Sequence, residues 1–199
     1  KAHSYASDSF LKKRRIFGVL GDPYSVIYEN ISNKYAEFHF DAAQRAIDAP
    51  NLADALKELD LARRAKNIIG INASLQFEKL QKSRNNLLGI LSDAQKKIEQ
   101  KSWKEANLII AKVASEDLSL RTKSTKLRKL LNDKHFESAF GAAETFLAKS
   151  KFKFAFEKVI EARSVYSSSP KLQELSNRVQ KSYFTSVKDT ISSAQANDN

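Results

Sequence analysis

Apolar residues recur with one spacing in three short segments of the chain. Each segment has a large apolar residue, an alanine three positions later, and apolar residues seven and ten positions later. These positions fall on one face of an α-helix, because neighbours on a helix surface are three or four residues apart. We therefore predict three short amphipathic helices, whose stripes form a repeated structural core. The twelve stripe residues are Leu52, Ala55, Leu59 and Ala62; Trp103, Ala106, Ile110 and Val113; and Phe152, Ala155, Val159 and Ala162.

Longer segments with helical periodicity separate the three stripes. The stripes begin 51 and 49 residues apart, which indicates a repeating unit of one long and one short helix. Turn-forming clusters such as Pro50-Asn51 and the serine run before Pro170 mark the breaks, and Ser102 with Glu105 forms a capping box before the second short helix. A pair of helices that meet near Asn132-Asp133 is an alternative for the third long segment. The expected helices span about 24–49, 52–66, 73–100, 119–149, 151–166 and 171–194, and the second short helix opens at Trp103.

This order of elements predicts an all-α fold built as an elongated array of antiparallel helical hairpins, an α-solenoid. The chain of 199 residues has five Gly and three Pro, and few helix breakers agree with that fold. Residues 23–199 form the expected repeat domain. By the repeat spacing, a further short helix would open near 200–203. The 171–194 helix is therefore expected to expose apolar side chains, or to bury them in a following segment or a second molecule.

Residues 1–22 differ from the repeat. A helix over 10–20 would carry Lys12, Lys13, Arg14 and Arg15 between large apolar residues. Such a basic amphipathic helix can close the open end of a repeat stack, lie on an anionic membrane surface or occupy a partner's groove. We favour the capping role, because the segment is rich in large apolar residues and an array needs a cap.

The short helices resemble the second helix of a tetratricopeptide repeat. In that family a bulky residue opens the helix, alanine follows three later, and aliphatic and small residues come after, as in the stripes that begin at Trp103 and Phe152. Ala43, Ala94 and Ala143 lie nine positions before the three opening residues, where the family has a small residue on its first helix. The period differs, about 50 here against about 34 in the family, and no proline follows the short helices at the family's position. The resemblance implies a concave groove that grips peptides or helices of partner proteins.

Residue types that carry catalysis or bind metals are sparse. There is no Cys, and the three His are not spaced as metal ligands. Glycine-rich phosphate loops and nucleophile-elbow motifs do not occur. We therefore expect no enzyme activity, no cofactor and no metal site. There is also no Met, even at position 1. If the chain is a processed fragment, an extracytoplasmic, periplasmic location is favoured.

The net charge of +11 raises a second functional class. Clustered cations bind phosphates and other anions by releasing counterions. The sequence thus favours a non-enzymatic scaffold that binds another protein, with binding of nucleic acid, another polyanion or an anionic membrane surface as the alternative. Self-association through the last helix is a further option. The candidate residues for an anionic partner are Lys12, Lys13, Arg14, Arg15, Arg121, Lys123, Lys126, Arg128, Lys129 and Lys134.

Overall fold

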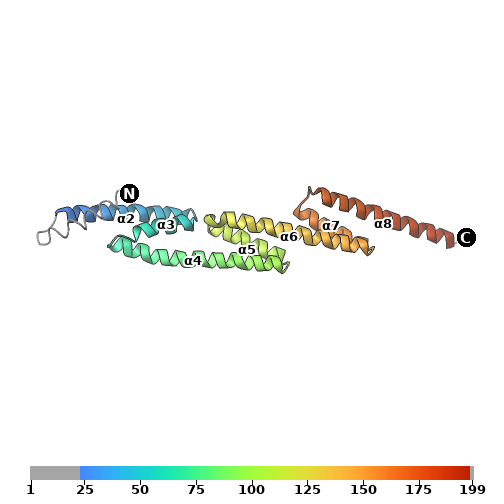
Figure 1. Ribbon diagram of the computed structural model, residues 1–199, viewed down its shortest axis with the longest axis horizontal. Coiled ribbons are helices and arrows are strands. Elements are labelled where there is room, and N and C mark those ends of the chain that lie inside the picture. The colour runs from blue at the N-terminus through green and yellow to red at the C-terminus, as the bar shows by residue number, and fades with distance from the viewer. Residues whose placement is uncertain (1–22, 198–199) are drawn as a thin grey trace. The chain divides into compact units, whose positions relative to one another are not determined.

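The computed structural model describes residues 23–197 of the chain (Figure 1). The described residues form α-helices and one 3-10 turn and contain no strand, which confirms the all-α class. The expected helix over 10–20, with Lys12, Lys13, Arg14 and Arg15, lies outside them. The elements are α2 (Pro23–Asp48), α3 (Leu52–Ala62), α4 (Ile68–Glu99), α5 (Trp103–Glu116), η1 (Leu118–Leu120), α6 (Arg121–Ala148), α7 (Phe152–Val165) and α8 (Pro170–Asn197).

Two helix boundaries differ from the sequence prediction. Helix α3 ends four residues early, and α4 begins at Ile68 rather than near residue 73. Gly70 lies in the first turn of α4, where the preceding chain approaches so closely that a Cβ atom would lie 1.9 Å from the carbonyl oxygen of Ala65. Helix α6 is continuous through Asn132, so the alternative of two helices there is wrong.

The chain divides into two compact units. The first comprises the described residues up to Gly89 together with Ser115–Leu120, and the second comprises Ile90–Ala114 and the residues from Arg121 onward. In the first unit, α3 packs between α2 and the N-terminal half of α4. Its core, to which all three helices contribute, consists of Ala43, Leu59, Ala62 and Ala73, with Phe40, Phe77 and Leu80 packed against it.

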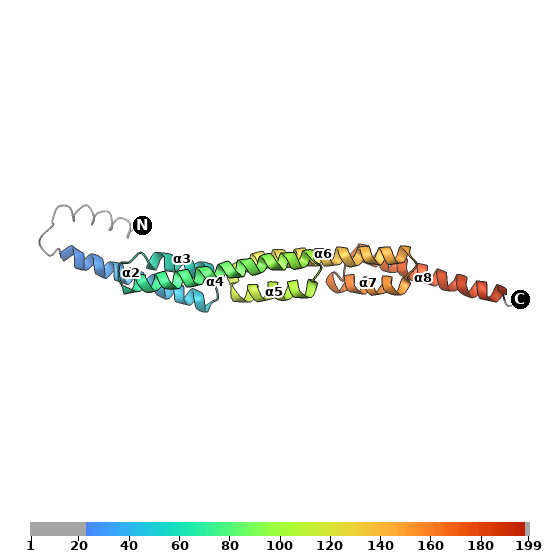
Figure 2. The same cartoon turned by 90° about the horizontal axis from the view of Figure 1, so that it is seen from below.

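The second unit holds two clusters of the same kind. In the first, α5 packs between the C-terminal part of α4 and α6, through Ala94, Ile98, Ala106, Ile110 and Leu131. In the second, α7 packs against α6 and α8, and both views place α6 and α7 side by side (Figures 1 and 2). That cluster contains Ala139, Ala143, Ala155, Val159, Ala162, Leu172, Leu175 and Val179.

Ten of the twelve stripe residues are buried, and the two aromatic ones, Trp103 and Phe152, are half-buried. Trp103, which its stripe places in the repeated core, packs against its cluster but is not fully enclosed. Trp103 is the first residue of α5 and lies at the end of its cluster, where its ring stacks on His135 with 5.0 Å between the ring centroids. The small residues Ala43, Ala94 and Ala143 are fully buried, so each long helix is closely approached where its alanine lies.

Candidate interaction surface

Helix α8 changes character halfway along its length. Leu172, Leu175 and Val179 in its first half are buried in the cluster with α7. Beyond them, Phe184, Val187 and Ile191 have 68%, 38% and 53% of their surface exposed. These three residues share one side of the helix, because they are three, four and seven positions apart. We call them the α8 apolar face. Its exposure agrees with the expectation that the last helix presents apolar side chains.

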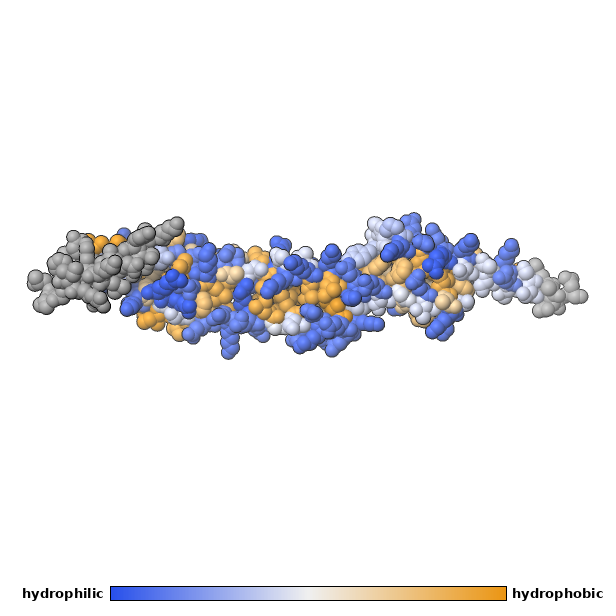
Figure 3. All heavy atoms as spheres, in the orientation of Figure 1, coloured by the Kyte–Doolittle hydropathy of each residue, from blue (hydrophilic) through white to orange (hydrophobic). Residues whose placement is uncertain are grey.

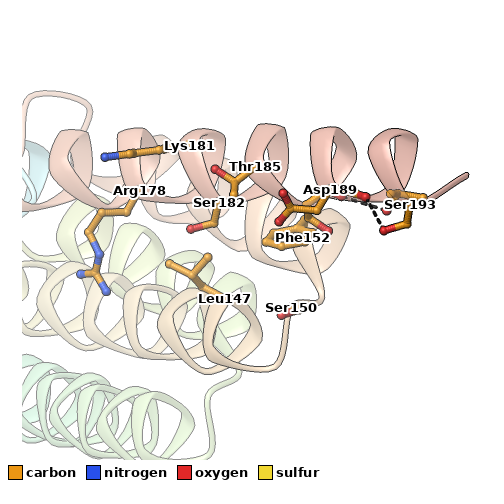
Figure 4. Close-up of a pocket in the computed structure, with 11 residues that line it drawn as sticks. Leu147, Ser150, Phe152, Arg178, Lys181, Ser182, Thr185, Asp189 and Ser193 are labelled. Atoms are coloured by element: carbon orange, nitrogen blue, oxygen red, sulfur yellow. Dashed lines mark hydrogen bonds between the residues drawn. The ribbon is translucent and has the colours of Figure 1, made fainter. Parts of the chain in front are cut away.

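A groove lies on another side of α8, over the turn that joins α6 to α7 (Figure 4). Its volume is about 890 Å³. Leu147, Ser150 and Phe152 line it from the turn, and α8 lines it with polar side chains. The Ser193 hydroxyl there donates a hydrogen bond of 2.8 Å to the carbonyl oxygen of Asp189. Figure 3 shows apolar and polar side chains intermixed at the surface over α6, α7 and α8.

The six candidate cations of α6 are all exposed. Lys134 Nζ lies 3.3 Å from Glu137 Oε2, while the other five have no carboxylate partner within the described part of the chain. They are spread around the helix: Arg121 and Arg128 share one side, Lys123 lies nearly opposite, and Lys126 and Lys129 lie between, as a helix of about 3.6 residues per turn requires. The helix thus offers cations in several directions rather than one convergent basic face. The basic cluster Lys12–Arg15 lies outside the described residues.

Asp117 is the one charged side chain among the buried residues of the described structure. Asp117 is fully buried; its Oδ1 accepts hydrogen bonds from the backbone N–H of Leu52 at 3.2 Å and from the backbone N–H and hydroxyl of Ser119 at 2.9 and 2.7 Å. Its Oδ2 lies 3.4 Å from Arg84 Nε. These contacts cap α3 and connect it to η1 and α4. No group of three or more His, Cys, Asp or Glu side chains in the described residues is arranged to hold a metal ion.

A polar contact recurs ten residues before each small alanine, and sequence reasoning missed it. At that position the long helices carry Asn33, Arg84 and Asp133, which contact Asn67, Asp117 and Tyr166 respectively. Each partner follows a short helix by one to five residues. Each contact therefore joins the segment that follows a short helix to the long helix that precedes it in the chain. The sequence signal that could have revealed these contacts is a polar residue ten positions before each small alanine.

Comparisons with known proteins do not add to this description. No protein-family model, curated protein or solved structure matches the chain. Among the described helices, none has the length and hydropathy needed to cross a membrane.

Proposed function

We propose that this protein is a non-enzymatic helical-repeat scaffold that binds another protein, and that its helices form an array of antiparallel hairpins similar to tetratricopeptide repeats. Three clusters that share one feature support the array. In each, a buried alanine of a long helix belongs to the same cluster as the residue seven positions after the start of a short helix. These pairs are Ala43 with Leu59, Ala94 with Ile110, and Ala143 with Val159.

The observation that carries the binding function is the α8 apolar face. Isolated exposed apolar residues are common on protein surfaces, but a contiguous stripe on one helix marks a site of interaction. Phe184, Val187 and Ile191 form such a stripe on the second half of α8. A helix with apolar residues at this spacing can lay its apolar face against a complementary surface of a partner protein.

A photo-crosslinking experiment tests the proposal. A photoreactive phenylalanine analogue is placed at Phe184 or at Ile191, and, as a matched control, at Ile160 of α7, which is 64% exposed but lies outside the stripe. Irradiation in the source cell should capture the same protein from positions 184 and 191 and not from 160. Capture of nothing from the stripe, or equal capture from all three positions, would count against a binding role for α8.

Binding of a polyanion is the second candidate function. It is supported by the net charge of +11 and by five exposed cations on α6 without carboxylate partners among the described residues. The spread of these cations around the helix favours weak, non-specific attraction over a shaped anion site. The salt dependence argued below distinguishes the two functions.

A further inference from the structure

The long helices share a pattern that extends into α8. Around Ala43, Ala94 and Ala143, an apolar residue lies seven positions before the alanine and another lies three before it. The same pattern occurs at Ala194, which follows Ala143 by 51 residues. A glutamine or glutamate follows the alanine in all four copies. The seven-before residues are Ala36, Leu87, Phe136 and Val187; the three-before residues are Phe40, Leu91, Phe140 and Ile191; the following residues are Gln44, Gln95, Glu144 and Gln195.

In the first three copies these apolar residues are buried or half-buried: Phe40, Phe136 and Phe140 are half-buried and pack against the clusters of the short helices, and the other three are buried. Ala36 and Leu87 have 0% and 4% of their surface exposed, and Leu91 has 7%. In α8 the equivalent residues are Val187 and Ile191, which are 38% and 53% exposed. Helix α8 therefore carries the long-helix half of a fourth unit, and the side chains that are buried or half-buried in the other units face outward.

The turn after each long helix sets the direction of the covering helix. In all three units the backbone N–H just before the short helix donates to a carbonyl five residues earlier, from Asn51 to Ala46, Ser102 to Lys97 and Lys151 to Phe146, at 2.8 to 2.9 Å. This chain reversal makes the short helix run back along the long one. A helix that covers the α8 apolar face in the same way runs antiparallel to α8.

The N-terminal turn of α7 gives a second indication of the same occupant. In the first unit, the equivalent turn between α2 and α3 contacts the segment that follows α5. Leu118 N–H donates to the carbonyl of Pro50 at 2.8 Å, and Asp117 accepts from Leu52 N–H. In register, Pro50 and Leu52 correspond to Ser150 and Phe152 at the N-terminus of α7. The N-cap of α7, Lys151, makes no side-chain capping bond. A carboxylate from the segment that follows a short helix fits there.

We propose that the α8 apolar face and the N-terminal turn of α7 together form a docking site for a helix of a partner protein that carries the short-helix pattern of α5. That helix has the spacing of α5: a bulky residue, alanine three later, aliphatic residues seven and ten later, and an acidic residue fourteen later, where the other two short helices are followed by Lys66 and Tyr166. Asp117 stands fourteen positions after Trp103 in just this relation. The inference rests on the proposed function and specifies the chemistry of the partner. Apolar residues of the helix cover Val187 and Ile191, and its acidic residue caps α7 at Phe152.

A peptide with the sequence of residues 102–120 is a suitable probe, because it contains both the stripe of α5 and Asp117. Its fluorescein-labelled form is titrated with the full chain, and binding is measured by fluorescence anisotropy. Binding should weaken at least about tenfold with the protein variant Ile191→Glu and remain unchanged with Ile160→Glu, the matched exposed isoleucine. Peptides with Ile110→Glu or Asp117→Asn should bind less tightly, the first because of the lost apolar contact and the second because of the lost cap. Circular dichroism confirms that both protein variants are folded.

Three results would overturn the inference. The first is absence of peptide binding, and the second is equal binding to both protein variants. The third is a dimer in sedimentation that Ile191→Glu dissociates, because a second copy of the chain would then be the occupant. The proposed function is tested separately: crosslinking of a partner at Ile191 without peptide binding would leave a protein-binding scaffold but refute this helix pattern. Failure of both experiments would remove both.

Discussion

At the residue scale, two helical glycines occupy opposite environments. A Cβ atom at Gly70 would lie 1.9 Å from the carbonyl oxygen of Ala65, whereas one at Gly141 would meet no atom within 4 Å. Gly70→Ala should therefore lower the free energy of unfolding by about 1–3 kcal/mol through steric strain. Gly141→Ala should raise it by about 0.5–1 kcal/mol, because alanine loses less backbone entropy in a helix. Urea unfolding of both variants measures the two effects, and a loss of stability in Gly141→Ala would contradict this account.

Asp117 has the most contacts of any buried polar side chain in the described structure, and its removal leaves several groups without a partner. Asp117→Ala should cost about 3 kcal/mol, the low end for a broken buried pair, because 30% of the Arg84 side chain is exposed. Asp93, which pairs with Lys96 at the surface, is the control, and Asp93→Ala should cost about 0–1 kcal/mol. Midpoints of urea unfolding compare the two, and equal costs would show that the Asp117 contacts contribute little.

The stability of the second unit should depend on pH through the carboxyl group of Glu161. Burial raises the pKa of its carboxyl, but hydrogen bonds from Lys158 and His135 outweigh burial, so the pKa lies below its ordinary value of 4.5. Because the folded-state pKa is lowered, its stabilising contribution is present above the unfolded pKa and is lost as pH falls through the folded one. Between about pH 5 and pH 3, the wild type should lose stability more steeply than Glu161→Gln. Urea unfolding at several acid pH values measures the free energy of unfolding of both proteins. An equal loss of this free energy with falling pH in the two proteins would refute the role of Glu161.

At the element scale, the small alanines determine how closely helices pack. Ala143 is fully buried where α7 packs on α6, so Ala143→Leu should overfill the contact and cost about 1–3 kcal/mol. Ala111 lies on the exposed side of α5 and serves as the control. Ala111→Leu should change stability by less than about 0.5 kcal/mol. Thermal unfolding of both variants gives the comparison, and a neutral Ala143→Leu would mean that α6 and α7 can separate to accept the larger side chain.

At the scale of the whole molecule, the net charge of +11 predicts salt-dependent attraction to polyanions. Affinity for a DNA duplex should fall log-linearly with salt. Charge reversal of Lys126, Arg128 and Lys129 should weaken binding and flatten its salt dependence. Reversal of Lys96, Lys97 and Lys158, which pair with carboxylates, changes the net charge equally and should have less effect. Affinity that hardly changes between low and moderate salt would exclude the polyanion function.

The sequence alone determined the elements and most of the core. Helical periodicity is local, so the order of long and short helices and the stripe of Leu59, Ile110 and Val159 could be read directly. The exposed face of α8 followed from the same period. Some predicted helix boundaries were wrong, such as the start of α4 near Gly70. This boundary depends on how closely the preceding segment approaches the helix, and hydrophobic periodicity carries no information about that distance.

Only the tertiary structure decided the polar contacts and the groove. Arg84 and Asp117 are 33 residues apart, and Leu52 and Asp117 are 65 apart, so no local pattern links them. The groove at Ser150 and Phe152 exists because α8 extends past the N-terminus of α7, and this depends on how the two helices are aligned. The half-burial of Trp103 was also decided by the tertiary structure. The sequence places Trp103 at the start of a helix, but only the packing of the helices places it at the end of a cluster.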